Sequence, residues 1–137
     1  MKIFDTKSNL VIEIEKIEKS DEEWKKILTV EQFNVTRKKG TEAPFSKTCP
    51  VPPKKHGIYK CVCCDTSLFY YKTKFESGTG WSSFYEPASD LNIKKISDGS
   101  RTEVLCARCD AHLGHVFSDG PPPTGKRYCI NTIAIQI

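Results

Sequence analysis

The first part of the chain, before Gly57, alternates between short apolar patterns and polar stretches. Leu10, Ile12 and Ile14 occupy every second position, which predicts a short strand near the N-terminus. Two capping boxes follow, each pairing a hydroxyl residue with Glu or Gln three positions later: Ser20 with Glu23 and Thr29 with Gln32. They predict one helix over 21–28 and a second reaching Lys38, which Gly40 ends.

The rest of the chain has the pattern of a β protein. Four prolines make residues 41–56 an extended connector, because proline fits poorly inside regular elements. After Gly57, short apolar runs are separated by Gly, Asp, Ser and Pro clusters, and we predict strands over Ile58–Cys61, Ser67–Tyr71, Thr102–Cys106, Leu113–Phe117 and Lys126–Ile137. The predicted fold class is α+β, mainly β, with short N-terminal helices before an antiparallel β domain.

Composition and charge narrow the possible classes of function. The 137 residues suit one domain, and neither a signal peptide nor a membrane-spanning run is visible, so we expect a cytoplasmic protein. The net charge of +4 arises within residues 29–60, which carry seven basic and two acidic side chains. Nucleic-acid-binding proteins usually spread positive charge over a whole face, so no nucleic-acid partner is expected.

Four of the seven cysteines form two Cys-x-x-Cys pairs, Cys61 with Cys64 and Cys106 with Cys109. The two-residue spacer lets both thiolates of a pair reach one ion, and two pairs complete a tetrahedral Zn²⁺ site. Four sulfur ligands leave no position for water or substrate, so we predict one structural zinc that clips together two hairpins. The alternative, two redox pairs, normally requires a βαβ pattern, which is absent here.

Three cysteines remain, Cys49, Cys63 and Cys129, and Cys129 has the most reactive surroundings. Strand alternation places Arg127, Cys129 and Asn131 on one face. A guanidinium lowers the pKa of a neighbouring thiol, and an amide can hydrogen-bond a polar substrate atom. An isolated strand cysteine is more often a buried small hydrophobe.

Two histidines precede this strand in the segment His112-Leu113-Gly114-His115. Residues three apart face opposite sides of a regular strand, but a bulge at Gly114 would direct both imidazoles into one pocket. Asp119 is placed either to orient a histidine or to pair with Arg127. A cysteine, two histidines and other polar side chains within twenty residues, 112–131, indicate a catalytic site.

The order of motifs resembles the B-type peptide-methionine-R-sulfoxide reductases. The resemblance covers about residues 20–137 and leaves 1–19 as an N-terminal extension. It rests on eight segments: Asp21–Trp24, Gly40–Phe45, Gly57–Cys61, Lys74–Trp81, Arg101–Val104, His112–Phe117, Pro123–Gly125 and Arg127–Asn131. It implies two antiparallel sheets, a zinc bound by the four paired cysteines, and an active site made of Trp81, His112, His115, Asp119, Arg127, Cys129 and Asn131.

The resemblance also implies a reaction and its partners. Cys129 attacks the sulfoxide sulfur of an oxidised protein beside the apolar wall of Trp81. A protonated His112 or His115 protonates the sulfoxide oxygen. Cys129 becomes a sulfenic acid, which a dithiol such as thioredoxin recycles. Many relatives have their resolving cysteine where this chain has Thr79. We therefore expect Cys49, in the connector, to resolve the sulfenic acid in preference to Cys63, with direct reduction by an external thiol as the alternative.

Two other functions fit parts of the sequence. A zinc-stabilised interaction module would use the paired cysteines but leave Cys129 and the histidines without a role. A cysteine hydrolase would use Cys129, a histidine and Asp119 for acyl transfer. The reductase is expected because it uses all of these residues, and we expect it to act as a monomer.

Overall fold

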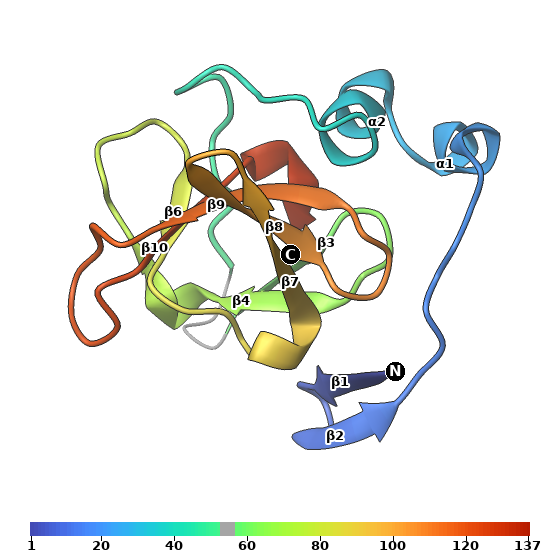
Figure 1. Ribbon diagram of the computed structural model, residues 1–137, viewed down its shortest axis with the longest axis horizontal. Helices are drawn as coiled ribbons and strands as arrows, with labels where there is room; N and C mark the ends of the chain where they lie inside the picture. The colour runs from blue at the N-terminus through green and yellow to red at the C-terminus, as the bar shows by residue number, and fades with distance from the viewer. Residues whose placement is uncertain (53–56) are drawn as a thin grey trace.

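The computed structural model describes residues 1–52 and 57–137 and is built around a six-stranded antiparallel sheet (Figure 1). The strand order is β5-β6-β10-β9-β8-β7. The bounds are Lys74–Phe75 for β5, Ser82–Phe84 for β6, Ile93–Asp98 for β7, Arg101–Cys106 for β8, His112–Phe117 for β9 and Arg127–Ile130 for β10. Strands β9 and β10 therefore lie at the centre, where the predicted catalytic residues are.

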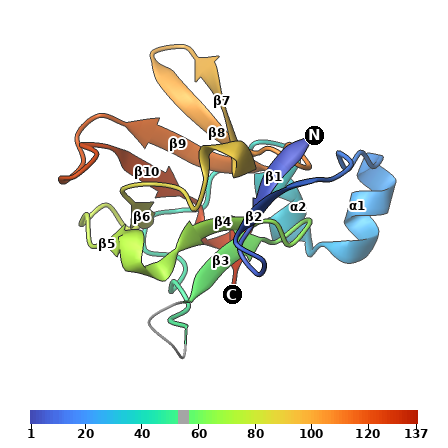
Figure 2. The same ribbon diagram turned by 90° about the horizontal axis from the view of Figure 1, so that it is seen from below.

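A smaller sheet packs against the first, with order β11-β3-β4 and bounds Ile135–Gln136, Ile58–Cys61 and Ser67–Tyr70. Figure 2 shows the two sheets as layers. Their facing sides meet in an aromatic core, in which Phe69 stacks on Phe84 at a ring-centroid distance of 4.5 Å and also contacts Tyr128. Burial of such large rings is the main stabilising contribution to a core of this size. The predicted fold of two antiparallel sheets is confirmed.

The two predicted helices are present, α1 over Asp21–Ile27 and α2 over Val30–Thr36. Both capping boxes form, because each N-cap hydroxyl accepts a backbone N–H and each Glu or Gln returns to the N-cap amide. Trp24 and Phe33 are the main buried anchors of the pair. Both helices have seven residues, and no helix of the described ranges is long and apolar enough to cross a membrane.

The N-terminal extension is a hairpin of β1 (Lys2–Asp5) and β2 (Leu10–Glu13) rather than a single strand. It is attached to the body by Asn92, whose amide accepts from the Phe4 N–H at 2.8 Å and donates to the Phe4 carbonyl at 3.0 Å. Asn92 is fully buried and also donates to Ser67 O. The extension is thus docked on the domain, although it lies outside the segment of family resemblance.

Two predictions for the β region require correction. The run Lys126–Ile137 is not one strand, because the chain leaves β10 at Ile130 and forms a 3₁₀ turn, η3 (Thr132–Ala134), before β11 joins the other sheet. Strands β5, β6 and β7 were not predicted. The first two have only two and three residues, and four of the six residues of β7 are exposed, so no apolar alternation marks any of them. Two further 3₁₀ turns are η1 (Tyr71–Thr73) and η2 (Asp90–Asn92).

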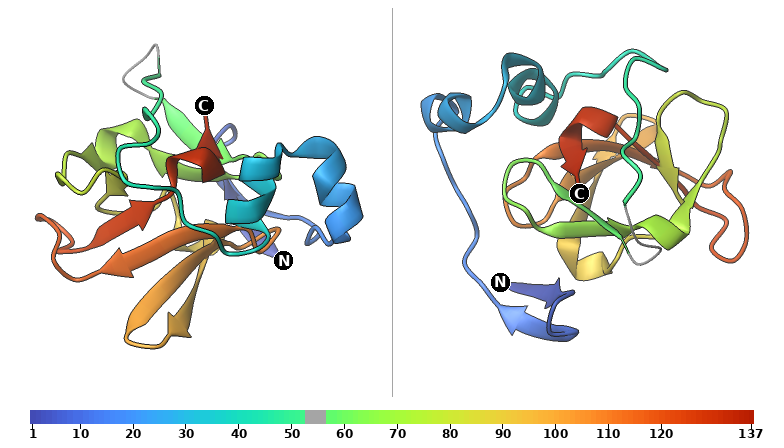
Figure 3. Two further views of the ribbon diagram at one scale, coloured as in Figure 1. Left: turned by 90° about the horizontal axis from the view of Figure 1, so that it is seen from above. Right: turned by 180° about the vertical axis from the view of Figure 1, so that it is seen from behind.

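The connector after α2 runs beside η3, as Figure 3 shows. Its residues 41–52 contain no helix or strand, as expected, and the last part of the predicted connector, residues 53–56, lies outside the described residues. The Glu42 carboxylate accepts from the Ile133 N–H at 2.9 Å, which fixes the connector to η3. This contact brings the connector to the edge of the predicted active site.

Candidate active site and metal site

The four paired cysteines come together between the two sheets. Cys61 ends β3 and Cys106 ends β8, while Cys64 and Cys109 lie in the turns that follow these strands. All four sulfurs lie within 4.8 Å of one another, with Cys61–Cys109 at 3.7 Å and Cys64–Cys106 at 3.5 Å. A tetrahedron with metal–sulfur bonds of about 2.3 Å has edges of about 3.8 Å, so the cluster fits a tetrathiolate metal site.

Two further residues, Cys63 and Arg37, contact the surroundings of this cluster. Cys63 lies outside the four-sulfur group and donates to the Thr36 hydroxyl at 3.3 Å, so it is a neighbour of the site. Arg37 donates to the Cys109 carbonyl at 2.8 Å and points a second N–H at the Cys109 sulfur at 3.7 Å. A guanidinium favours negative charge on the thiolates, and here it also ties α2 to the site.

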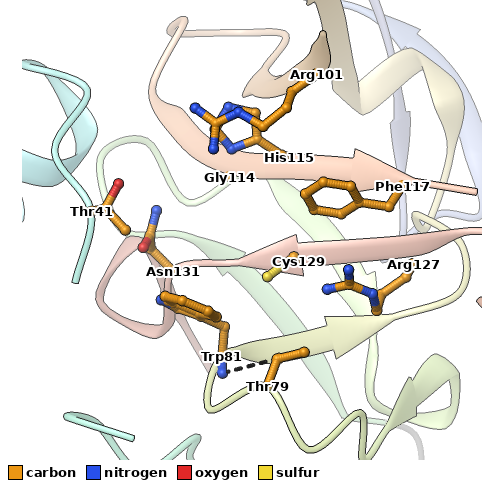
Figure 4. A pocket seen from close by; sticks show the side chains of 10 residues that line it. All are labelled: Thr41, Thr79, Trp81, Arg101, Gly114, His115, Phe117, Arg127, Cys129 and Asn131. Carbon is orange, nitrogen blue, oxygen red and sulfur yellow. Dashed lines mark hydrogen bonds between the residues drawn. The ribbon is translucent and has the colours of Figure 1, made fainter. Parts of the chain in front are cut away.

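A second, open site lies on the six-stranded sheet, and Figure 4 shows it as a pocket around Cys129. The cavity measures about 220 Å³ and is lined by side chains from both sheet strands and loops, namely Thr41, Thr79, Trp81, Arg101, Gly114, His115, Phe117, Arg127, Cys129 and Asn131. The prediction that Arg127, Cys129 and Asn131 share one face is confirmed, since Tyr128 and Ile130 point into the core. The pocket thus combines one thiol with aromatic, basic and amide groups.

The electrostatics of the Cys129 thiol differ from the expectation. Burial raises the pKa of the Cys129 thiol above its ordinary value, and the Arg127 guanidinium and the Thr79 hydroxyl offset only part of that effect. The prediction that Arg127 makes this thiol more acidic than usual is therefore wrong for the net pKa, although its sign is right for Arg127 itself. The sequence could not show burial, which is the larger contribution.

Trp81 and Asn131 are held in place by the connector. The Trp81 indole N–H donates to the Glu42 carbonyl at 3.0 Å, and the Glu42 N–H donates to the Asn131 amide oxygen at 3.2 Å. The Asn131 amide also donates to Leu113 O at 3.1 Å, which leaves its orientation well defined. One residue of the connector therefore positions both the apolar wall and the amide of the pocket.

The predicted bulge is present next to Gly114. Val104 is paired with Gly114 and Leu105 with His112, so Leu113 is the extra residue of β9. A side chain at Gly114 would overlap the Cys129 carbonyl, so only glycine allows β10 to approach here. The two imidazoles become neighbours, with ring centroids 5.6 Å apart.

The two histidines nevertheless occupy different positions. His115 lines the pocket, and its Cα is the register partner of Cys129 across β9 and β10. His112 is buried behind it, with an exposed fraction of 3%. The expectation that both imidazoles face the pocket is wrong for His112, and of the two only His115 lines the cavity.

Each histidine is paired with a carboxylate that was not predicted. His115 Nε2 lies 2.8 Å from Asp98 Oδ2, and His112 Nδ1 lies 2.7 Å from Glu103 Oε2. Glu103 is a register partner of His115 on β8, and Asp98 lies at the end of the unpredicted strand β7. No local motif in the sequence marks either residue, because only strand pairing brings them to the histidines.

Asp119 takes the second of its two predicted roles. Its carboxylate accepts from Arg127 Nε at 2.9 Å and from Arg127 Nη2 at 3.2 Å, a bidentate pair outside the pocket lining. Arg127 also stacks over Phe117 at 4.5 Å from the ring centroid. Held from two sides, the guanidinium remains at the pocket wall beside Cys129.

Cys49, the expected resolving thiol, does not line the pocket. It lies in another groove, and Trp81 borders both that groove and the pocket. Cys49 packs against the core, and the neighbouring Tyr59 hydroxyl donates to Pro50 O at 2.6 Å. Burial, together with the nearby Cys49 thiol, raises the pKa of the Tyr59 phenol. Cys49 and Cys129 therefore line two different cavities that have Trp81 in common.

Comparison with known proteins agrees with this geometry. Residues 28–137 match the family model of the SelR domain. The chain is 56% identical over 128 residues to a peptide methionine sulfoxide reductase MsrB of Pseudomonas fluorescens, which covers 90% of this chain and 98% of that protein. It is 58% identical over 123 residues to peptide methionine sulfoxide reductase B1, chloroplastic, of Oryza sativa subsp. japonica, with 86% of this chain and 56% of that protein covered. The protein therefore belongs to the MsrB family of peptide methionine sulfoxide reductases.

Proposed function

We propose that the protein reduces methionine-R-sulfoxide in oxidised proteins to methionine, with Cys129 as the nucleophile. The observation that carries the proposal is the pocket itself, which places one thiol among Trp81, Asn131, His115 and Arg127. The indole offers a flat apolar surface for the S-methyl group, and the Asn131 amide offers a hydrogen bond to a polar substrate atom.

The chemical step transfers the sulfoxide oxygen to the thiol. Cys129 Sγ loses its proton and attacks the sulfoxide sulfur. His115 delivers a proton to the sulfoxide oxygen as the bond between the two sulfurs forms. Transfer of that oxygen to Sγ releases methionine and leaves Cys129 as a sulfenic acid. One thiol and one sulfoxide thus become one sulfenic acid and one thioether, so atoms and electrons balance.

Recycling requires a second thiol, for which we propose Cys49. Its thiol condenses with the sulfenic acid, releases water and forms a disulfide, which a dithiol such as thioredoxin reduces. Cys49 borders the groove next to the pocket and sits in a segment without regular structure, whereas Cys63 lies against the metal site. A disulfide needs Cα atoms within about 7 Å, so the proposal requires the connector to bring Cys49 to the pocket of Cys129.

The metal site is proposed to hold one structural Zn²⁺, because four cysteine sulfurs with tetrahedral spacing are a preferred zinc environment. The proposed location is the cytoplasm, a reducing compartment in which cysteines more often bind metal or do redox chemistry than form structural disulfides. The proposal includes neither a nucleic-acid partner nor a membrane, and it treats the protein as a monomer.

Mass spectrometry of Cys129 after addition of one equivalent of substrate, without reductant, tests the proposal. A sulfenate or a disulfide at Cys129 is expected of a reductase. An acyl adduct with an ester substrate would identify a hydrolase, and an unmodified thiol would identify a binding module. Peptide mapping of the same sample tests recycling, since a Cys49–Cys129 link supports Cys49 and a Cys63–Cys129 link or a persistent sulfenate contradicts it.

A further inference from the structure

Lys39, the third residue after α2, joins the two histidine–carboxylate pairs behind the pocket. Its ammonium lies 3.1 Å from Asp98 Oδ1 and 3.2 Å from Glu103 Oε1. The other oxygen of each carboxylate is the one that binds a histidine, Asp98 with His115 and Glu103 with His112. The two imidazoles pack edge to face, so Lys39 and the two carboxylates bridge a pair of histidines that are also neighbours of each other.

The backbone at Lys39 indicates that its side chain is required there. Lys39 has φ of +57°, a left-handed conformation that glycine adopts easily and that strains other residues. The position follows the end of a helix, where the Gly40 N–H closes the turn on Asn34 O at 2.9 Å and glycine is common. A lysine in this conformation positions its ammonium between two carboxylates, which glycine cannot do.

We propose that Lys39 is a positioning residue that orients the proton donor of the active site by holding Asp98 and Glu103 on their histidines. The inference rests on the proposed function, in which His115 protonates the sulfoxide oxygen. Asp98 holds His115 Nε2, so Nδ1 is the ring atom that remains to exchange a proton with substrate. Lys39 acts through the carboxylates and does not line the pocket.

The electrostatics around the histidine pair support this role. Hydrogen bonds from His115 and then Lys39 lower the pKa of Asp98 to about 2, so this carboxylate remains an acceptor. Burial lowers the pKa of His112, and the charge of Lys39 adds to that lowering. The groups that face the pair from all neighbouring elements are Lys39 after α2, Asp98 on β7, Arg101 and Glu103 on β8, and Arg127 and Cys129 on β10.

Three substitutions in the full-length protein separate a positioning role from a structural one. Lys39→Met removes the charge and keeps the length, and Lys39→Gly removes the charge and relieves the left-handed backbone. Lys38→Met is the matched control, because the adjacent lysine pairs with the exposed Asp21 at 2.6 Å and lies over the Phe33 ring, away from the histidine pair. We expect kcat for methionine-R-sulfoxide to fall about tenfold in both Lys39 variants. The loss is smaller than the roughly 10²–10⁴-fold contribution of a general acid, because the variants misplace the proton donor without removing it.

The pH dependence gives a readout that a purely structural role would not change. Lys39 is one of the charges that lower the pKa of His112, so its loss should raise that pKa and, through the contact between the two imidazoles, alter the alkaline limb of the kcat profile. NMR titration should show a higher pKa for His112 in both Lys39 variants, while KM and the melting temperature of Lys39→Gly stay near the wild-type values.

Wild-type kcat in the Lys39 variants would overturn the proposal, as would a lower kcat with an unchanged pH profile and an unchanged His112 titration. An equal loss in Lys38→Met would also overturn it. Absence of turnover in the wild-type protein would instead contradict the proposed function, and the NMR titration of His112 would still decide whether Lys39 controls the histidine pair.

Discussion

The protein contains two groups of sulfur that differ in almost every respect. In the metal site, each cysteine sulfur has other cysteine sulfurs as its main neighbours, and three of the four residues are buried. In the pocket, Cys129 is the only thiol, and its neighbours are an indole, an amide, an imidazole and a guanidinium. The first group lies between the two sheets, and the second lies on the open face of one sheet.

This difference shows how one residue type serves stability in one place and chemistry in another. Four thiolates complete the coordination of one metal ion and leave no position for a further ligand. A metal bound there would hold the two sheets together. Burial raises the pKa of the Cys129 thiol and so favours its protonated form. Because Cys129 also lines a cavity, a substrate can reach it. Four substitutions test this contrast.

The largest expected effect is on catalysis, in Cys129→Ser. Turnover of methionine-R-sulfoxide should fall by about 10⁴-fold or more, because the nucleophile is lost. The free energy of unfolding should change by less than about 1 kcal/mol, since serine is nearly isosteric and the pocket is open. Turnover assays and urea denaturation measure the two effects, and residual activity near the wild-type rate would remove Cys129 from the mechanism.

The next largest effect is on stability, in Cys106→Ser. Loss of one of four metal ligands should lower the free energy of unfolding by more than about 4 kcal/mol, with loss of bound zinc. Cys63→Ser is the matched control from the same cluster of loops, and it should cost less than about 1 kcal/mol because only its hydrogen bond to Thr36 changes. Native mass spectrometry counts the zinc, and a folded, metal-free Cys106→Ser protein with normal stability would contradict a structural metal site.

A smaller loss is expected in His115→Asn. Removal of the proton donor should lower kcat about 10²-fold and abolish the alkaline limb of its pH profile, while the thiol at Cys129 still reacts with alkylating agents. Steady-state kinetics over a range of pH provides the measurement. A profile that keeps the same alkaline limb would assign the proton to another group.

The smallest effect concerns the acidity of the thiol, in Arg127→Met. The Arg127 charge lowers the pKa of Cys129 against the larger effect of burial, so its removal should raise this pKa further. Below the pKa, the rate of Cys129 alkylation should therefore fall about three- to tenfold, and its pH profile should move to higher pH. Lys126→Met, a neighbouring exposed cation, should leave the profile in place; a shift toward lower pH in Arg127→Met would reverse the assigned role.

The sequence predicts best those features that depend on local spacing. Both capping boxes, the two cysteine pairs and the common face of Arg127, Cys129 and Asn131 are confirmed, because helix caps, metal knuckles and strand alternation are set by near neighbours. The bulge beside Gly114 belongs to the same class.

The features that the sequence missed depend on contacts between distant strands. Asp98 and Glu103 reach the histidines only through the pairing of β7, β8 and β9, and Lys39 reaches both carboxylates from beyond α2. The net pKa of Cys129 likewise depends on burial, which no pattern of neighbouring residues reveals.

The central claim is that Cys129 reduces one diastereomer of methionine sulfoxide, and the most direct measurement is turnover of each diastereomer of blocked methionine sulfoxide with dithiothreitol as reductant. The account predicts that the wild-type protein consumes the R form, leaves the S form unchanged, and loses this activity in Cys129→Ser. Equal rates on the R and S forms, or turnover of the S form alone, would contradict it.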